Sequence, residues 1–187
     1  ISDQYHSYII DLWGVMHDGV RLNEGAYQAV LKLKVDHKKV CFLSNAPETA
    51  TMLRGKLRAL GICDEAYDGL ITSGEVAKNI LKSQNNMIKS AYFMGIEDQK
   101  SILKEAGITQ VAVAEDADIL LCAGIYNDML SLDEYREELG LCLAHNLPMY
   151  CVNPDRIVYS GHYQKLVICA GEMAHYYAAQ GLCLIHI

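Results

Sequence analysis

The amino-acid sequence predicts an α/β fold in which a parallel sheet carries helices on both faces. The first observation is that apolar stretches of strand length alternate with amphipathic helical stretches along the chain. The second is a pair of sharp turn signals, Ser73-Gly74-Glu75 and Asn153-Pro154-Asp155. They bracket a middle segment of about 75–80 residues, which is a common domain size. We therefore expect an α/β domain with a second, smaller α/β domain inserted into it, the two turn signals acting as hinges.

The segment before the first turn signal should contain three strands, each followed by a helix. The strands are expected at residues 8–12, 39–43 and 68–72, and the helices at 24–36, 47–60 and 76–82. Pro47 suits the first turn of a helix, where its missing N–H is no loss, and Gly61 suits the position just past a helix end.

The rest of the chain repeats this alternation. Strands are expected at residues 91–94, 110–114, 119–122 and 148–152, with a last one starting at residue 182. Helices are expected at residues 98–106, after a capping box formed by Ser131 and Glu134, and at residues 166–179.

Composition excludes two classes of partner. The chain has 16 Lys and Arg against 23 Asp and Glu, a net charge of −7. Its sequence contains no basic run that would bind nucleic acid. No apolar run approaches the roughly 20 residues that span a membrane. Seven cysteines without a CxxC pair indicate a reduced, cytoplasmic location. The sequence is silent on oligomeric state, so a homo-oligomer stays open.

Both ends of the chain lead us to expect a truncated piece of a longer protein. It starts at Ile1 rather than at Met, and it stops at Ile187 inside a stretch that resembles a strand.

Polar residues follow the first two expected strands. Asp11 ends an apolar strand, where a carboxylate needs a partner or a function, and Ser44-Asn45 end the next strand. The carboxyl ends of neighbouring parallel strands share one crevice, so these side chains should lie close together. A carboxylate and a hydroxyl beside the N-terminus of a helix near Pro47 would form a phosphate site.

These residues resemble the haloacid dehalogenase (HAD) superfamily, and within it the class IIA branch of NagD-type and nitrophenyl-phosphatase-like proteins. The resemblance is carried, in chain order, by residues 11–19 (DLWGVMHDG), 43–47 (LSNAP), 72–75 (TSGE), 153–155 (NPD) and 169–172 (CAGE). It implies a Rossmann-like HAD core with an inserted C2-type α/β cap domain. The implied divisions are residues 1–73 for the first part of the core, 74–152 for the cap and 153–187 for the second, truncated part of the core.

The resemblance also implies a chemistry. Asp11 would attack the phosphorus of a small phosphorylated metabolite and form an aspartyl-phosphate, which water then hydrolyses. Mg²⁺ would be bound by the Asp11 carboxylate and by the backbone carbonyl of Trp13. Ser44 and Asn45 would bind the phosphoryl group.

The chain departs from the family pattern at Trp13, where the family carries an Asp that transfers protons. An indole cannot take that role, although His17 and Asp18 are near in sequence. A lysine motif and an acidic motif would follow Ile187, and Lys165 precedes the last helix, so we assign it to a solvated loop. These departures keep open a phosphate- or nucleotide-binding protein without turnover, or an inactive fragment. A flavodoxin-like or dinucleotide-binding domain ranks last, because no GxGxxG follows the first strand and a carboxylate there would repel a pyrophosphate.

Overall fold

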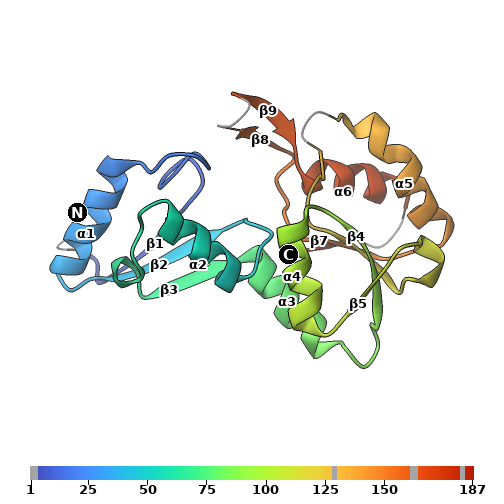
Figure 1. Ribbon diagram of the computed structural model, residues 1–187, viewed down its shortest axis with the longest axis horizontal. Helices are drawn as coiled ribbons and strands as arrows, with labels where there is room; N and C mark the ends of the chain where they lie inside the picture. Colours follow the sequence, from blue (N-terminus) through green and yellow to red (C-terminus); the bar gives the residue numbers. More distant parts are fainter. Residues whose placement is uncertain (1–3, 128–129, 161–163, 182–183) are drawn as a thin grey trace.

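The computed structural model describes residues 4–127, 130–160, 164–181 and 184–187. Its elements form two units that lie side by side, each built around its own parallel sheet (Figure 1). This confirms the predicted α/β class.

The first unit has the sheet order β1-β2-β3, with β1 at Ser7–Asp11, β2 at Lys39–Ser44 and β3 at Gly69–Thr72. Helices α1 (Glu24–Val35) and α2 (Ala50–Ala59) pack on one face through a core that includes Val30, Phe42 and Leu57. On the opposite face Ile9, Leu43 and Ile71 are exposed. Among the described residues, helices therefore cover one face of this sheet rather than both.

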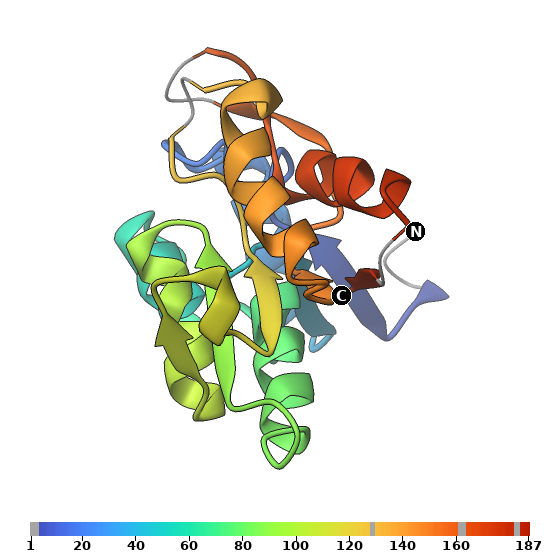
Figure 2. The same cartoon turned by 90° about the vertical axis from the view of Figure 1, so that its right-hand side faces the viewer.

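The second unit is a five-stranded parallel sheet in the order β10-β7-β6-β4-β5. Its strands are β4 (Ser90–Met94), β5 (Thr109–Val111), β6 (Ile119–Cys122), β7 (Met149–Cys151) and β10 (Leu184–His186). Helices α3 (Ser73–Ser83) and α4 (Ser101–Ala106) cover one face, and α5 (Leu132–Ala144) and α6 (Ala170–Ala179) cover the other (Figure 2). The capping box at Ser131 and Glu134 opens α5 as predicted.

An antiparallel hairpin, β8 (Ile157–Ser160) and β9 (Lys165–Ile168), lies between β7 and α6. This hairpin is not among the elements predicted from the sequence. Lys165 stands at the start of β9 and not in a solvated loop, and the last helix begins at Ala170 rather than at residue 166.

The strand expected from residue 182 was assigned to the core, together with all of residues 153–187, but the observed strand β10 lies in the second unit. β10 pairs in parallel with β7 of the second sheet, and not with the first sheet. The reason is that α6 buries Met173, Ala174 and Tyr177 in the core of the second unit, so the strand that follows returns beside β7. The first two residues of that expected strand, 182 and 183, lie outside the described residues.

Two predicted helix starts are also shifted. α2 begins at Ala50, three residues after Pro47, and α3 begins at Ser73, so Ser73-Gly74-Glu75 form a first helical turn and not a hinge loop. Thr72 caps α3, its hydroxyl oxygen accepting from the Glu75 N–H at 2.9 Å.

No helix in the described part of the chain is long and apolar enough to cross a membrane. The described cysteines are all free thiols.

The carboxylate of Asp68, just before β3, is expected to make the stability of the first unit depend on pH in acid. Its carboxylate accepts from Lys34 Nζ at 2.6 Å, from the Val40 N–H at 2.8 Å and from Lys39 Nζ at 3.1 Å. These bonds, led by the one from Lys34, hold the pKa of Asp68 well below its ordinary value of 3.8. A carboxyl whose pKa is lower in the folded state stabilises the fold above its unfolded pKa, and this contribution is lost as the pH falls.

We therefore expect Asp68→Asn to lower Tm at pH 7, with a difference from wild type that shrinks as the pH falls below 3.8. Thermal unfolding followed by circular dichroism between pH 7 and pH 2.5 measures this. Asp133→Asn, which removes a carboxylate from the exposed pair with Arg136, should change Tm little. A constant difference between Asp68→Asn and wild type over that range would contradict the expectation.

Candidate active site

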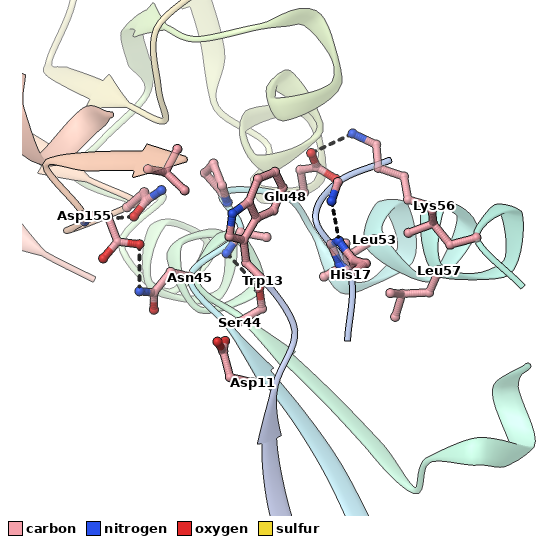
Figure 3. Close-up of a pocket in the computed structure, with 16 residues that line it drawn as sticks. Asp11, Trp13, His17, Ser44, Asn45, Glu48, Leu53, Lys56, Leu57 and Asp155 are labelled. Atoms are coloured by element: carbon pink, nitrogen blue, oxygen red, sulfur yellow. Dashed lines mark hydrogen bonds and ion pairs between the residues drawn. The ribbon is translucent and has the colours of Figure 1, made fainter. Parts of the chain in front are cut away.

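A cavity of about 520 Å³ lies at the carboxyl ends of β1 and β2, on the side that faces the second unit. The loop after β1, the segment from β2 into α2, and residues after β7 line it (Figure 3). Its polar side chains are Asp11, Trp13, His17, Ser44, Asn45, Glu48, Lys56, Asn153 and Asp155. The four site residues that the sequence analysis selected, Asp11, Trp13, Ser44 and Asn45, therefore all line one cavity.

Asp11 and Ser44 come together because β1 and β2 pair in parallel. Asp11 stands opposite Leu43, so Ser44 lies one residue further along β2 (Figure 3). The Asp11 side chain is exposed, whereas Ser44 is 8% exposed and its Oγ accepts from the Ala46 N–H at 3.1 Å. No described residue accepts the Ser44 hydroxyl hydrogen, which is therefore available to a ligand.

The Asn45 side-chain amide makes a contact within the protein. Its Nδ2 donates to Asp155 Oδ2 at 3.1 Å, so the side chain joins the end of β2 to the segment after β7. Asp155 also donates its own N–H to Asn153 Oδ1 at 2.9 Å, as expected of a turn, and its carbonyl accepts from the Gly171 N–H at 3.0 Å. Asp155 thus serves a turn and lines the cavity.

The segment after Ser44 is held by the first turn of α3. Thr72 Oγ1 donates to the Glu48 carbonyl at 2.6 Å, and Ser73 Oγ donates to the carbonyls of Asn45 and Ala46 at 2.8 and 3.0 Å. At the N-terminus of α2, the Ala50 N–H donates to Glu75 Oε2 at 3.1 Å, so this N–H is not available to a phosphate.

The loop after β1 is closed by backbone hydrogen bonds, among them Met16 N–H to Leu12 O at 2.8 Å and Gly14 N–H to His17 O at 2.8 Å. His17 is 7% exposed, and its Nδ1 accepts from the Gly19 N–H at 3.0 Å. Burial lowers the pKa of His17, against the opposing charges of Asp18 and Asp11, so the neutral imidazole is favoured.

Asp18 does not lie where it could transfer a proton in the cavity. It is exposed and outside the cavity lining, and its Oδ1 accepts from the backbone N–H groups of Val20 and Arg21 at 2.9 and 2.7 Å. Of the two residues considered as substitutes for Trp13 in proton transfer, His17 alone lines the cavity.

Acidic groups outnumber basic ones along the cavity. Asp11, Glu48 and Asp155 contribute carboxylates, and Lys56 is the one Lys or Arg among the residues that line it in the described structure. Lys56 Nζ lies 2.7 Å from Glu48 Oε1 and 3.1 Å from Asp98 Oδ2 of the second unit. Burial lowers the pKa of Lys56, but its two carboxylate partners outweigh this and raise the pKa above its ordinary value. The ammonium therefore stays charged.

The donor set fits a magnesium ion in part. Asp11 and Trp13 both line the cavity, a carboxylate and a backbone carbonyl are the oxygen ligands that Mg²⁺ prefers, and a cation would offset the surplus of carboxylates. No group of three or more His, Cys, Asp or Glu side chains that would hold an ion occurs within the described ranges. The protein would thus provide one or two ligands, as is usual where waters and phosphate oxygens complete the magnesium shell.

Sequence reasoning missed Glu48 and Lys56 as lining residues. Glu48 directly follows the motif at residues 43–47, and that position was the one available signal. Lys56 lies eight residues further on, and only its place on α2 brings it to the cavity.

Similar proteins support the family relation. A sugar-phosphatase from Bacillus subtilis, AraL, is 29% identical over 149 residues, which cover 79% of this chain and 53% of that protein. The chain thus spans about half the length of the curated relative that it matches.

Solved structures share the fold. A haloacid dehalogenase-like hydrolase from Brucella suis superposes with a TM-score of 0.87 at 27% identity, over 98% of this chain and 69% of that one. A p-nitrophenyl phosphatase from Archaeoglobus fulgidus gives a TM-score of 0.70 at 23% identity, over 97% and 67% of the two chains. A glycerol phosphate phosphatase from Mycobacterium tuberculosis in complex with magnesium gives a TM-score of 0.74 at 20% identity, over 100% and 55%.

Residues 8–109 match the haloacid dehalogenase-like hydrolase family, and this range contains Asp11, Trp13, Ser44 and Asn45. Because the match covers more than half of the 187 residues, the chain belongs to the family of haloacid dehalogenase-like hydrolases.

Proposed function

We propose that the protein is a Mg²⁺-dependent phosphatase of small phosphorylated metabolites, with Asp11 as the phosphoryl acceptor. The observation that carries the proposal is the placement of the exposed Asp11 carboxylate and the buried Ser44 hydroxyl at neighbouring strand ends in one cavity. The names of the relatives, a sugar-phosphatase, a glycerol phosphate phosphatase and a p-nitrophenyl phosphatase, support this class of substrate.

In the first step an Asp11 carboxylate oxygen forms a bond to phosphorus while the bond from phosphorus to the ester oxygen breaks. The ester oxygen keeps the electron pair of that bond, takes up a proton from solvent and leaves as the alcohol. In the second step the oxygen of a water forms a bond to phosphorus and gives up a proton to solvent, while the bond from phosphorus to Asp11 breaks and returns the carboxylate. Inorganic phosphate is released.

Charge is the main obstacle to this reaction. A carboxylate that approaches a phosphate dianion is repelled, and Glu48 and Asp155 increase the negative charge of the cavity. When bound, Mg²⁺ would neutralise charge on Asp11 and on a phosphate oxygen. Ser44 would donate its hydroxyl to a second phosphate oxygen, and the Asn45 backbone N–H would bind the phosphoryl group beside it.

The proton on the leaving oxygen limits the choice of substrate. The Trp13 indole neither gives up nor accepts a proton near neutral pH, so a leaving group that needs little protonation should react best. Nitrophenolate is such a group.

The second unit would act as the cap of this site. Asn153, Asp155 and Val158 line the cavity from that side, and Asn45–Asp155 and Lys56–Asp98 join the two units. We propose that the cap begins with α3 and extends past residue 152, because α6 and β10 pack with its sheet. A reduced, cytoplasmic environment agrees with the free thiols, and we propose it as the location.

The proposal is tested by magnesium-dependent phosphate release from p-nitrophenyl phosphate, using the full-length protein. We expect release that stops when EDTA removes the metal and returns when Mg²⁺ is added, while Ca²⁺ supports less, because it prefers longer bonds and more ligands. Release that continues unchanged in EDTA would contradict the magnesium requirement.

Trp13 favours a second candidate, a phosphate-binding protein without turnover, because its side chain stands where a proton-transfer group is expected. Calorimetry with inorganic phosphate distinguishes the two. Binding of phosphate together with a complete lack of release from p-nitrophenyl phosphate would replace the phosphatase proposal by this one.

A further inference from the structure

A second cavity, of about 210 Å³, adjoins the first. Trp13, Pro47, Asn153 and Val158 line both, so the two cavities share a wall. The other residues of the second cavity come from the second unit, at the carboxyl ends of β4 and β6 and along the hairpin. Asp11 and Ser44 line only the first cavity.

Trp13 forms part of that shared wall. Gly19 has a φ of +89°, and a Cβ atom there would lie 2.6 Å from Cη2 of the indole, so the absence of a side chain at Gly19 makes room for the ring. The His17 ring meets the indole edge to face, with 5.7 Å between ring centroids. Although packed on these sides, Trp13 is still 43% exposed. It therefore presents an aromatic surface to a ligand.

The chemistry of the two cavities differs. No Asp, Glu, Lys or Arg lines the second cavity among the described residues. Its walls include the apolar side chains of Ile96, Ile125 and Val167, with the amide of Gln99 as a polar group. A charged group placed there would find no partner of opposite charge among the described lining residues.

The size of the second cavity limits what it holds. Sites that bury a drug-sized ligand measure roughly 300–1,000 Å³. A cavity of about 210 Å³ suits a group of sugar size or smaller.

We propose that the second cavity takes the leaving group of the substrate, and that the Trp13 side chain is a specificity-determining residue that packs against it. This rests on the proposed phosphatase function. With the phosphoryl group between Asp11 and Ser44, the alcohol extends across Trp13 into the apolar cavity. The substrates are therefore phosphate monoesters of uncharged alcohols, and esters whose alcohol carries a carboxylate are rejected.

A matched pair of substrates tests the charge rule. Glycerol 3-phosphate and 3-phosphoglycerate both have three carbons, but only the second carries a carboxylate on its leaving group. We expect kcat/KM of the full-length protein to be higher for glycerol 3-phosphate by about tenfold or more, since an unpaired charge in an apolar site costs at least this much. Equal values, or a preference for 3-phosphoglycerate, would overturn the proposal.

Substitutions test the role of Trp13. Trp13→Ala should raise KM for p-nitrophenyl phosphate about tenfold, the usual scale for loss of one packed aromatic contact, while the inhibition constant of inorganic phosphate stays unchanged. Trp13→Phe should restore most of the affinity. A general disturbance of the site would raise the KM and the inhibition constant together and would overturn the proposal.

Fluorescence gives a reading that does not depend on turnover. Trp13 is the sole tryptophan of the 187 residues, so the difference between wild type and Trp13→Phe isolates its emission. Glycerol 3-phosphate should change this emission far more than inorganic phosphate does, and equal responses would contradict the inference even if Trp13→Ala does not fold. A wild type that releases no phosphate from any ester would overturn the proposed function as well, whereas release with an unchanged KM in Trp13→Ala overturns this inference alone.

Discussion

Asp11→Asn is expected to abolish phosphate release from p-nitrophenyl phosphate in the full-length protein. The amide is a poor nucleophile and lacks the charge that would bind Mg²⁺, so both proposed roles of Asp11 are lost together. Loss of the nucleophile in an enzyme that works through a covalent intermediate lowers kcat by about 10⁴-fold or more. Stopped assays of phosphate with purified wild type and variant measure this directly.

Folding is not expected to change in Asp11→Asn. Asp11 is exposed at the end of β1, and the substitution keeps the shape of the side chain, so the Tm should match wild type. Asp36→Asn provides the matched control, because it makes the same chemical change at an exposed residue just after α1, outside the cavity. Asp11→Asn that retains a tenth or more of wild-type kcat would contradict the role of Asp11 as the phosphoryl acceptor.

The fold was predictable where burial follows a regular pattern. β2 and β6 are apolar stretches with buried side chains, and the expected bounds differ from the observed ones by at most one residue. The hairpin of β8 and β9 was not predictable in this way, because three of the four side chains in β8 are exposed or half-exposed and polar residues flank it. The position of β10 depends on the packing of α6 against a distant core, which no local pattern reports.

The site likewise has features that could be predicted from the sequence and features that could not. Asp11 and Ser44 follow apolar strands, so topology alone brings them together. The predicted start of α2 at Pro47 was wrong, because Pro47 suits a loop as well as a helix. The position of the helix start depends on contacts with α3, whose residues lie 25 or more positions away in the sequence. Asn45 was expected to face the phosphate, and only the three-dimensional structure shows its amide bound to Asp155, which is 110 residues away.

Gly74→Ala is expected to destabilise the protein strongly and to reduce its activity. Gly74 is the second residue of α3, and a Cβ atom there would lie 2.4 Å from the backbone N, C and O atoms of Glu48. Backbone atoms cannot rotate away as a flexible side chain does, so α3 and the segment at Glu48 must separate. Such overpacking costs about 1–3 kcal/mol, which in a protein of this size lowers Tm by about 2–12 °C.

The loss of activity follows from the same contact. The segment that would be displaced carries Ser44 and Asn45 at its start, and the first turn of α3 holds it through the hydrogen bonds of Thr72 and Ser73. Gly55→Ala is the matched control: it lies in α2 with nothing within 4 Å of the added Cβ, so it should raise stability by about 0.5–1 kcal/mol and leave kcat unchanged. The two Gly→Ala variants should therefore shift Tm in opposite directions in a thermal melt. If Gly74→Ala also raised Tm, the close approach between α3 and Glu48 would not hold in solution, and the positioning of Ser44 by α3 would fall with it.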